Sequence, residues 1–329
     1  MDIQKIASAD IQPIDLKRID DLPGPYCMSF GFELEPLVRS VKRVGLVNSP
    51  LLIEDGKGTL KVVSGYRRIQ AAKSIKWDHI PCRVLQESEF SPLECLLLNL
   101  HENLATRSLN NVEKGMALSH LNSYLSLNEI MKDYMPLLDL PSREETFYLF
   151  LKIENELDEK IKVYLAQGHI SLQVVRMLLN METVSRSPVF SVISNLKFNI
   201  NQQIQLINYI VDISHVIRVP VIELLKEQTL KNIFLNNSLN TPQKAKAVLR
   251  LLKIKRFPTL TEAEKTFNKM VSSLNLPKGV RIDPPLFFES PDYRLEILFK
   301  EGKELREKIG RLFKIDGLEE LGNPWERGA

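Results

Sequence analysis

Several features of a secreted or membrane protein are missing from this sequence of 329 residues. No apolar run approaches the roughly 18 residues that a membrane helix needs, and residues 1–5 have neither a basic segment nor an apolar one. Cysteine is scarce: Cys27, Cys82 and Cys95 stand apart, without the spacing of a metal or redox site. These absences favour a cytoplasmic protein whose thiols are structural.

The chain also has little excess of charge of either sign. The net charge is only +3, so any contact with nucleic acid must come from local groups of Lys and Arg. Apolar residues make up 44% and charged residues 26% of the chain, which excludes the composition of a disordered protein. Because the chain is too long for one ordinary core, we expect three domains, at residues 1–104, 105–238 and 239–329.

The first of these domains mixes helical and extended patterns. Apolar residues at helical spacing predict a helix over 34–44, and Gly45 follows where a C-cap glycine belongs. Residues 49–54 and 59–63 predict two strands joined by the turn-forming residues 55–58. This succession predicts an α/β domain.

The segment from residue 62 to residue 72 carries the clearest chemical signal. A strand ends at Ser64 and Gly65, and a helix then starts with Arg67 and Arg68 in its first turn. Glycine lets backbone amides approach a ligand, a helix N-terminus favours an anion, and guanidinium groups bind phosphate oxygens in pairs. The pattern predicts a phosphate site at these four residues. The alternative is a plain turn followed by a solvated helix face.

A second cluster lies downstream, at Glu102 and Asn103. A carboxylate and a carboxamide are hard oxygen ligands, which suit a Mg²⁺ ion shared with the phosphates of a nucleotide. Together the two clusters favour a nucleotide site over a plain turn.

In their order along the chain these segments resemble the boxes of the ParB family. The residues that carry the resemblance are Leu37-Val38-Arg39-Ser40-Val41, Gly45-Leu46-Val47, Pro50, Gly65-Tyr66-Arg67-Arg68, Glu102-Asn103-Leu104, Leu109-Asn110 and Glu113. The resemblance implies a fold shared with sulfiredoxin and a site for CTP with Mg²⁺. It assigns the phosphates to the Gly65 motif with its two arginines, and it assigns the metal to Glu102 and Asn103.

Three positions depart from the family's pattern. Tyr66 stands where the family has Glu, Gln70 where it has a later Arg, and Ala105-Thr106 where it has Gln-Arg. These departures favour nucleotide binding over efficient hydrolysis, so we expect at most a weak CTP hydrolase. A sulfiredoxin activity needs a catalytic cysteine at the position of Tyr66, and a cysteine elsewhere does not replace it.

The middle of the chain, residues 92–236, has helical patterns almost throughout, and residues 152–172 also resemble the family. The resemblance places a helix-turn-helix at residues 127–138 and 142–153, with Ser142 as the cap of the second helix. Arg143, Thr146 and Tyr148 would then contact DNA. Residues 126–186 carry 7 basic and 10 acidic residues, however, and this excess of acid disfavours contact with phosphates. A purely structural helical pair is the alternative.

The last part of the chain begins with a basic amphipathic stretch over residues 240–256, in which Lys246, Arg250 and Lys253 are candidate DNA contacts. A solvated helix face is the alternative. Strands over 279–282 and 293–299 and a helix over 303–313 follow, and they resemble the family's dimerisation module. We expect this small unit to bury Ile282, Leu295, Ile297 and Phe299 against a second copy.

The fold class expected from these patterns is a multi-domain α+β protein with a ParB/sulfiredoxin-like α/β N-terminal domain, an all-α middle domain and a small α/β C-terminal domain. The main hypothesis is a homodimeric, nucleoid-associated DNA-binding protein that binds CTP and Mg²⁺ and acts in chromosome or plasmid partition, with a partition ATPase as a possible partner. One alternative is a nucleotide hydrolase, kinase or nuclease on the same fold. The other is an adaptor that binds no nucleotide.

Overall fold

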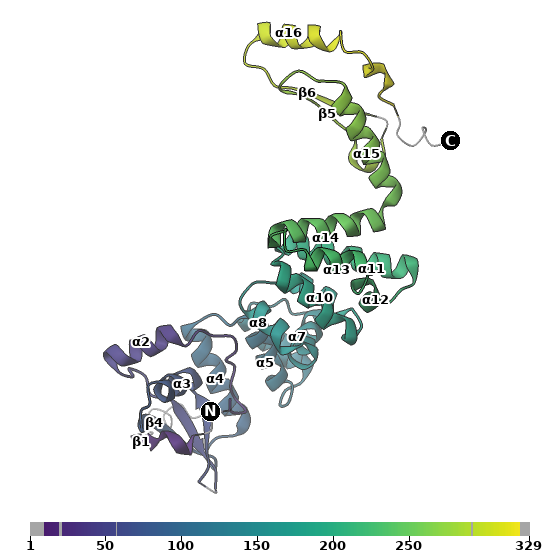
Figure 1. Cartoon of the computed structure of the whole chain (residues 1–329). Helices are drawn as coiled ribbons and strands as arrows, with labels where there is room; N and C mark the ends of the chain where they lie inside the picture. Colours follow the sequence, from purple (N-terminus) through teal and green to yellow (C-terminus); the bar gives the residue numbers. More distant parts are fainter. Residues whose placement is uncertain (1–9, 20–21, 57, 291, 323–329) are drawn as a thin grey trace. The chain divides into compact units, whose positions relative to one another are not determined.

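The structure is a computed structural model and describes residues 10–19, 22–56, 58–290 and 292–322. The N-terminal residues 1–5 and Lys57 of the expected turn lie outside this part of the chain. The described residues form two compact units. One unit comprises the chain up to Ile193 together with Asn199–Ile204, and the other comprises Ser194–Phe198 and the chain from Gln205 onward (Figure 1).

A four-stranded sheet organises the start of the first unit. Its strands are β1 (Ile11–Asp15), β2 (Leu51–Glu54), β3 (Leu60–Ser64) and β4 (His79–Gln86), arranged in the order β1-β4-β2-β3. β2 and β3 form the expected antiparallel hairpin, whereas β2 and β4 run parallel. The parallel strands β2 and β4 are joined by a crossover that contains β3 and helix α3 (Tyr66–Ser74). Because α3 follows β3 directly in the chain, the helix begins where the strand ends.

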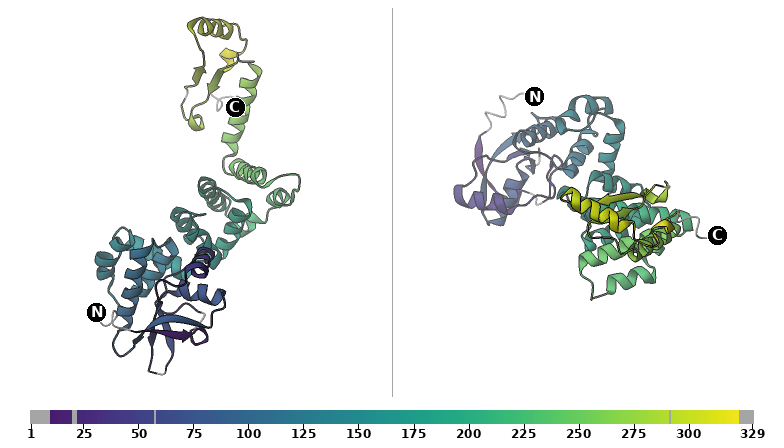
Figure 2. Two further views of the ribbon diagram at one scale, coloured as in Figure 1. Left: turned by 90° about the vertical axis from the view of Figure 1, so that its left-hand side faces the viewer. Right: turned by 90° about the horizontal axis from the view of Figure 1, so that it is seen from above.

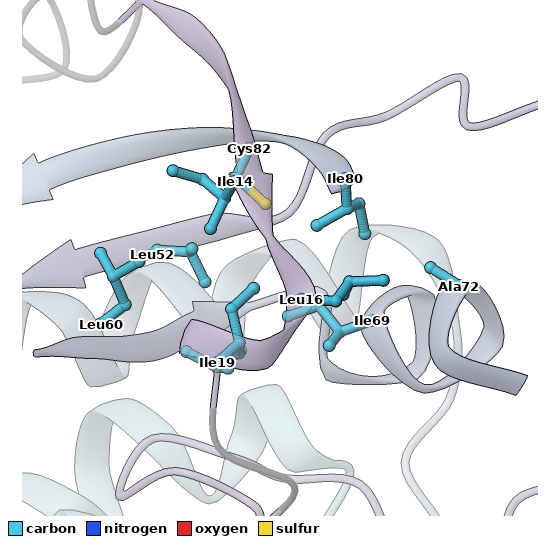
Figure 3. Close-up of a cluster of buried hydrophobic side chains, with 10 residues drawn as sticks. Ile14, Leu16, Ile19, Leu52, Leu60, Ile69, Ala72, Ile80 and Cys82 are labelled. Carbon is cyan, nitrogen blue, oxygen red and sulfur yellow. The ribbon is translucent and has the colours of Figure 1, made fainter. Parts of the chain in front are cut away.

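One face of this sheet packs on α3. Leu52 and Ile80 from the strands meet Ile69 and Ala72 from the helix, and all four are fully buried (Figure 3). Helix α2 (Glu35–Val44) packs in turn against α3 through Val38 and Val41, and it ends at Gly45 with a positive φ, as expected. The α3 helix is therefore held on two sides, which fixes the direction of its N-terminus.

The chain between β4 and β5 is fully described, and it contains helices and loops without a strand (Figure 2). Its elements up to residue 235 are α4 (Pro92–Thr106), α5 (Asn111–Leu121), α6 (Leu127–Glu129), η2 (Ile130–Tyr134), η3 (Pro136–Leu138), α7 (Glu144–Glu156), α8 (Glu159–Ala166), α9 (Leu172–Leu179), α10 (Thr183–Leu196), α11 (Ile200–Ile217), α12 (Val221–Leu225) and α13 (Gln228–Leu235). The helical character predicted for residues 92–236 is confirmed.

The two helices expected to form a helix-turn-helix differ from the prediction in two ways. The first helix is not one α-helix, because α6 passes into a π-helical turn and then into a 3-10 turn that ends at Leu138. The second helix, α7, has Arg143 rather than Ser142 as its N-cap, without a capping side-chain hydrogen bond. The reason is local: the Arg143 amide donates to the Pro141 carbonyl in a tight turn, and the helix starts one residue later than the serine requires.

Side-chain caps define where α4 and α5 begin. Ser91 and Glu94 form a reciprocal capping box at the start of α4, and Asn110 and Glu113 form another at the start of α5. The second box includes Glu113. It fixes the backbone of Glu113 at a helix N-terminus, where a carboxylate is also favoured by the helix dipole.

The second unit ends in a small mixed module. Helix α14 (Thr241–Arg256) is followed by α15 (Pro258–Ser273), the antiparallel strands β5 (Val280–Asp283) and β6 (Arg294–Ile297), the short turn η4 (Leu286–Phe288), helix α16 (Gly302–Leu312) and a last turn η5 (Leu318–Glu320). Phe267 of α15 stacks on Tyr293 at 5.6 Å and meets Phe288 edge-on at 5.8 Å. These contacts give the module a core of its own. The predicted strands and helix are present in it.

No helix among the described residues is long and apolar enough to span a membrane.

Candidate anion-binding site

A cavity of about 260 Å³ opens in the first unit, where the end of β3, the start of α3 and the C-terminal turns of α4 meet. The described residues that line it are Cys27, Ser29, Leu37, Asn48, Ser64, Gly65, Tyr66, Arg67, Arg68, Asn99, Glu102, Asn103, Thr106 and Arg107. All six residues of the predicted phosphate and metal clusters are among them. The structure therefore brings together two segments that lie more than thirty residues apart in the sequence.

Gly65 lets the chain turn from the strand into the helix. Its φ of +92° is one that L side chains rarely adopt, and an added Cβ would lie 2.9 Å from Cα and Cβ of Pro50. The carbonyl oxygen of Gly65 accepts the first hydrogen bonds of α3, from the amides of Arg68 and Ile69. This tight turn presents the N-terminus of α3 to the cavity, as the sequence predicted.

Arg67 is held on three sides. Its Nη2 donates to Oε1 of Glu113 at 2.5 Å, its Nε donates to the hydroxyl of Ser29 at 3.3 Å, and its guanidinium lies 4.5 Å from the ring centre of Phe32. Burial, and secondly the positive charge of Arg107, lower the pKa of Arg67, whereas Glu113 acts in the opposite direction. An anion in the cavity would favour the charged guanidinium.

Arg68 is fixed by the loop before β2 and by α4. Nη1 donates to the carbonyl oxygen of Asn48 at 3.0 Å, and Nη2 donates to Oε1 of Glu102 at 2.6 Å. The two arginines of the motif therefore point to different walls of the same cavity. The alternative that they lie on a solvated helix face is not supported, since Arg67 and Arg68 side chains are only 27% and 18% exposed.

Arg107 is a third guanidinium at the cavity, and the sequence patterns did not predict it. Its Nε donates to Oδ1 of Asn103 at 2.8 Å, its Nη1 to Oε2 of Glu113 at 2.6 Å, and its Nη2 to the carbonyl oxygen of Met28 at 2.8 Å. The signal available in the sequence was its place directly after Ala105-Thr106, one residue beyond the arginine that the family's pattern expects.

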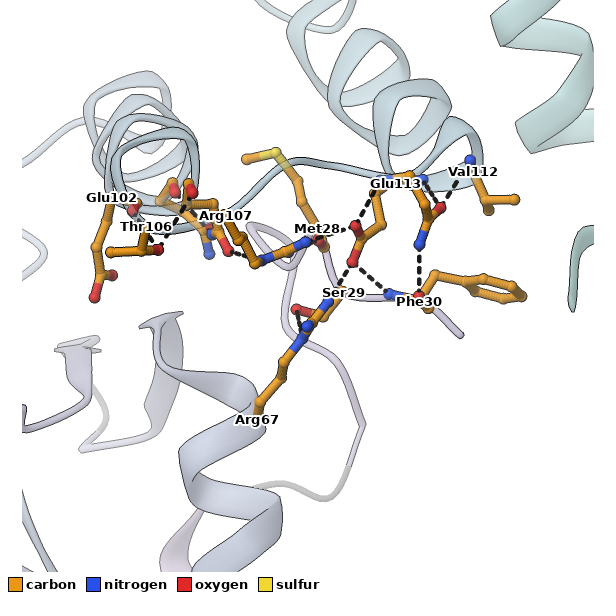
Figure 4. Close-up of polar contacts among 12 residues, drawn as sticks. Met28, Ser29, Phe30, Arg67, Glu102, Thr106, Arg107, Val112 and Glu113 are labelled. Atoms are coloured by element: carbon orange, nitrogen blue, oxygen red, sulfur yellow. Dashed lines mark hydrogen bonds and ion pairs between the residues drawn. The ribbon is translucent and has the colours of Figure 1, made fainter. Parts of the chain in front are cut away.

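Glu113, in the first turn of α5, contacts two of these arginines. It is 1% exposed and accepts hydrogen bonds from Arg67 and Arg107 and from the backbone amides of Phe30 and Asn110 (Figure 4). Four donors surround one carboxylate, which satisfies a buried charge. Glu113 was recognised in the sequence only as part of the third family box, and its contacts show that it positions two of the three arginines.

The predicted metal ligands are present but engaged with arginines. Oε1 of Glu102 accepts from Arg68, and Oδ1 of Asn103 accepts from Arg107. The amide nitrogen of Asn103 donates to the carbonyl oxygen of Asn99 at 2.9 Å, which fixes the carboxamide in this orientation. No group of three His, Cys, Asp or Glu side chains arranged for a metal occurs in the described part of the chain. Arranged in this way, Glu102 and Asn103 do not fit Mg²⁺.

Cys27 is the only cysteine among the described residues that line the cavity. Burial raises the pKa of its thiol, which disfavours the nucleophilic thiolate. The three free cysteines are all buried, in keeping with a structural role.

The charge of the lining favours an anion. Three arginines and one glutamate contribute charge among the described lining residues, and the start of α3 adds its backbone amides and helix dipole. Guanidinium groups that converge on one cavity recognise carboxylate or phosphate oxygens.

The predicted DNA contacts lie in both units. Arg143 is exposed at the start of α7, and Thr146 is partly exposed one turn later, beside Glu144 and Glu145. In the other unit Lys246 and Arg250 are exposed on α14. Lys253 instead pairs with Glu264 of α15 at 2.7 Å, which neutralises part of the basic face.

Comparison with known proteins relates the first part of the chain to one family. Residues 2–104 match the model of the ParB N-terminal domain family. A probable chromosome-partitioning protein ParB of Coxiella burnetii is 22% identical over 176 residues, which are 54% of this chain and 58% of that protein. A probable plasmid-partitioning protein ParB of Thermus thermophilus is 36% identical over 112 residues, 34% of this chain and 35% of that protein. The matched segments thus span about half the length of these relatives, or less.

Among solved structures, a C-terminally truncated chromosome-partitioning protein ParB of Caulobacter crescentus, complexed with CTP-γ-S, is similar to part of this chain. The sequence identity is 19%, the match covers 53% of this chain and 94% of that one, and the TM-score is 0.27.

The fold is that of a multi-domain α+β protein whose N-terminal domain has an arginine-lined cavity at a strand-to-helix turn. Residues 2–104 match the ParB N-terminal domain family, and the relatives named above are ParB proteins.

Proposed function

We propose that the N-terminal domain binds CTP, with the phosphates in the cavity formed by β3, α3 and α4. The observation that carries the proposal is the convergence of Arg67, Arg68 and Arg107 on a cavity at the N-terminus of α3. Guanidinium forks and helix amides are what a row of phosphate groups requires. The choice of cytosine rests on the resemblance of residues 2–104 to the ParB N-terminal domain family.

The test is calorimetric titration of the whole chain with CTP, ATP and GTP. Arg67→Ala removes one guanidinium and leaves Glu113 with Arg107, so we expect the affinity for CTP to fall by at least about tenfold. The matched control is Arg43→Ala, an exposed arginine of α2 that does not line the cavity. Binding that Arg67→Ala leaves unchanged would contradict the proposed site, and a wild-type chain that binds no nucleotide would favour the adaptor alternative.

We also propose that the chain binds DNA, with the exposed basic residues of α14 as the stronger electrostatic contact. Lys246 and Arg250 are exposed, whereas the start of α7 carries two glutamates that repel phosphates. We expect a Lys246→Gln and Arg250→Gln double variant to bind DNA more weakly and with a smaller dependence on salt, as measured by fluorescence anisotropy. If only the substitution Arg143→Gln weakens binding, α7 is the reader instead.

A role in chromosome or plasmid partition, as a homodimer and beside a partition ATPase, completes the proposal. It rests on the family and on the names of the two relatives. The measurement that tests it is the turnover of a purified partition ATPase with this chain and DNA present: no change in turnover would argue against this partner.

A further inference from the structure

One carboxylate oxygen of Glu102 and the carboxamide oxygen of Asn103 already accept hydrogen bonds from guanidinium groups. Arg68 donates to Glu102 at 2.6 Å, and Arg107 donates to Asn103 at 2.8 Å. A cation at Glu102 and Asn103 would lie beside two positive charges, which is unfavourable unless both arginines move away. The arrangement suits a site in which arginines themselves supply the positive charge.

Arg107 has the position and the unused N–H donors to bind an anion in the cavity. It lines the cavity, and its side chain is 20% exposed. Its hydrogen bonds to Asn103, Glu113 and Met28 use three of the five N–H groups of a guanidinium. The remaining two can donate to a ligand without breaking the contacts that hold the side chain.

Those contacts also make the guanidinium rigid. Nε, Nη1 and Nη2 are each bonded to a different element: α4, α5 and the loop around Met28. Little side-chain entropy is then lost when an anion binds, so a pre-positioned arginine contributes more to affinity than a flexible one.

We propose that Arg107 is a third phosphate-binding residue, and that Arg67, Arg68 and Arg107 together bind the triphosphate without a divalent cation. This proposal rests on the proposed nucleotide function and adds to it the source of the positive charge. Thr106 stands where the family's pattern has an arginine, and Arg107 supplies a guanidinium from the next residue.

The test is calorimetric titration of the whole chain with CTP, once with Mg²⁺ and once with EDTA. We expect the wild-type dissociation constant to differ by less than about threefold between the two conditions, since the arginines carry the electrostatic contact. Arg107→Gln should weaken binding in EDTA by at least about tenfold, because a charged hydrogen-bond donor is lost. Arg107→Lys should recover part of the affinity, since it restores the charge without the fork.

The matched control is Arg43→Gln, which removes an exposed arginine outside the cavity and should bind CTP as the wild type does. Circular dichroism and thermal unfolding show whether Arg107→Gln is folded. Wild-type binding that needs Mg²⁺, or equal affinity of wild type and folded Arg107→Gln in EDTA, would overturn the proposal while leaving the nucleotide function intact. No nucleotide binding under either condition would instead overturn both.

Glu102→Gln gives an answer even if Arg107→Gln does not fold. Without a metal, the Glu102 carboxylate repels phosphates and competes for Arg68, so its neutral replacement should strengthen CTP binding in EDTA by about two- to fivefold. If Glu102 is a metal ligand, the same variant weakens binding in Mg²⁺ instead. The sign of the change therefore separates the two arrangements.

Discussion

At the scale of single residues, Glu113 is the group on which the geometry of the cavity depends most. Its carboxylate is 1% exposed and pairs with both Arg67 and Arg107. Glu113→Ala leaves two guanidinium groups without their counter-charge and removes the reciprocal cap of α5. Because both arginines keep some contact with water, we expect a loss of about 3 kcal/mol in the free energy of unfolding, the lower end for a broken buried pair. Urea unfolding followed by circular dichroism measures it.

The control for this substitution is Glu33→Ala, an exposed glutamate in the same domain. Its removal should change the free energy of unfolding by less than about 0.5 kcal/mol. A loss below about 1 kcal/mol for Glu113→Ala would mean that the two arginines find other partners or water, and that the buried carboxylate does not hold the cavity together.

Residues of the site could be predicted from the sequence when their partners lie close by in the chain, and not when the partners lie far away. Gly65, Arg67 and Arg68 form a local strand-turn-helix pattern, so spacing alone predicts them. Arg107 and Glu113 gain their meaning from contacts with residues about 40 to 80 positions away, such as Arg67 and Met28. No local sequence pattern predicts such a pairing, so the contact between the Gly65 turn region and α5 could not be predicted.

At the scale of elements, the hairpin of β2 and β3, the helix α3 and the helical middle were predictable because their periodicity is strong. The cap of α7 was not. A serine after a proline is a common N-cap pattern, yet the backbone turn at Pro141 shifts the helix start to Glu144. Helix boundaries depend on a few dihedral angles, whereas helix existence depends on a whole apolar face.

The packing of α5 on α7 gives a test at the same scale. An added Cβ on Gly115 of α5 would lie 2.9 Å from the carbonyl oxygen of Phe150, which is backbone of α7 and gives way only if the helices separate. Gly115→Ala should therefore destabilise the chain by about 1–2 kcal/mol, because overpacking exceeds the gain in helix propensity. Thermal unfolding measures the shift.

Gly310 of α16 is the matched control, since an added Cβ there meets nothing within 4 Å. Gly310→Ala should raise the stability of its own unit by up to about 0.5–1 kcal/mol, the ordinary helix preference of alanine. Stabilisation by both substitutions would show that α5 and α7 can move apart at no cost.

At the scale of the whole molecule, the C-terminal module leaves an apolar groove of about 480 Å³ open to solvent, and a second copy is the partner we propose for it. The groove is lined by Ile282, Tyr293, Leu295, Ile297, Ile309, Leu312, Phe313, Leu318 and Leu321. Of the four residues expected to meet a second copy, Ile282 lines the groove but is only 7% exposed and belongs to the core of its own module. Leu295 and Phe299 are each 50% exposed, and Phe313 is 86% exposed.

Such exposure is costly for a unit this small, and pairing two copies would remove it from water. We expect light scattering to give twice the single-chain mass of 37.8 kDa for the wild type. A Leu295→Asp and Phe313→Asp double variant should give one chain mass, because a buried carboxylate at either position opposes association. Val216→Asp, on the exposed end of α11 and outside the groove, should remain a dimer. A wild-type monomer at micromolar concentration would contradict the proposed dimer, and a dimer that survives the double variant would place the interface on another surface.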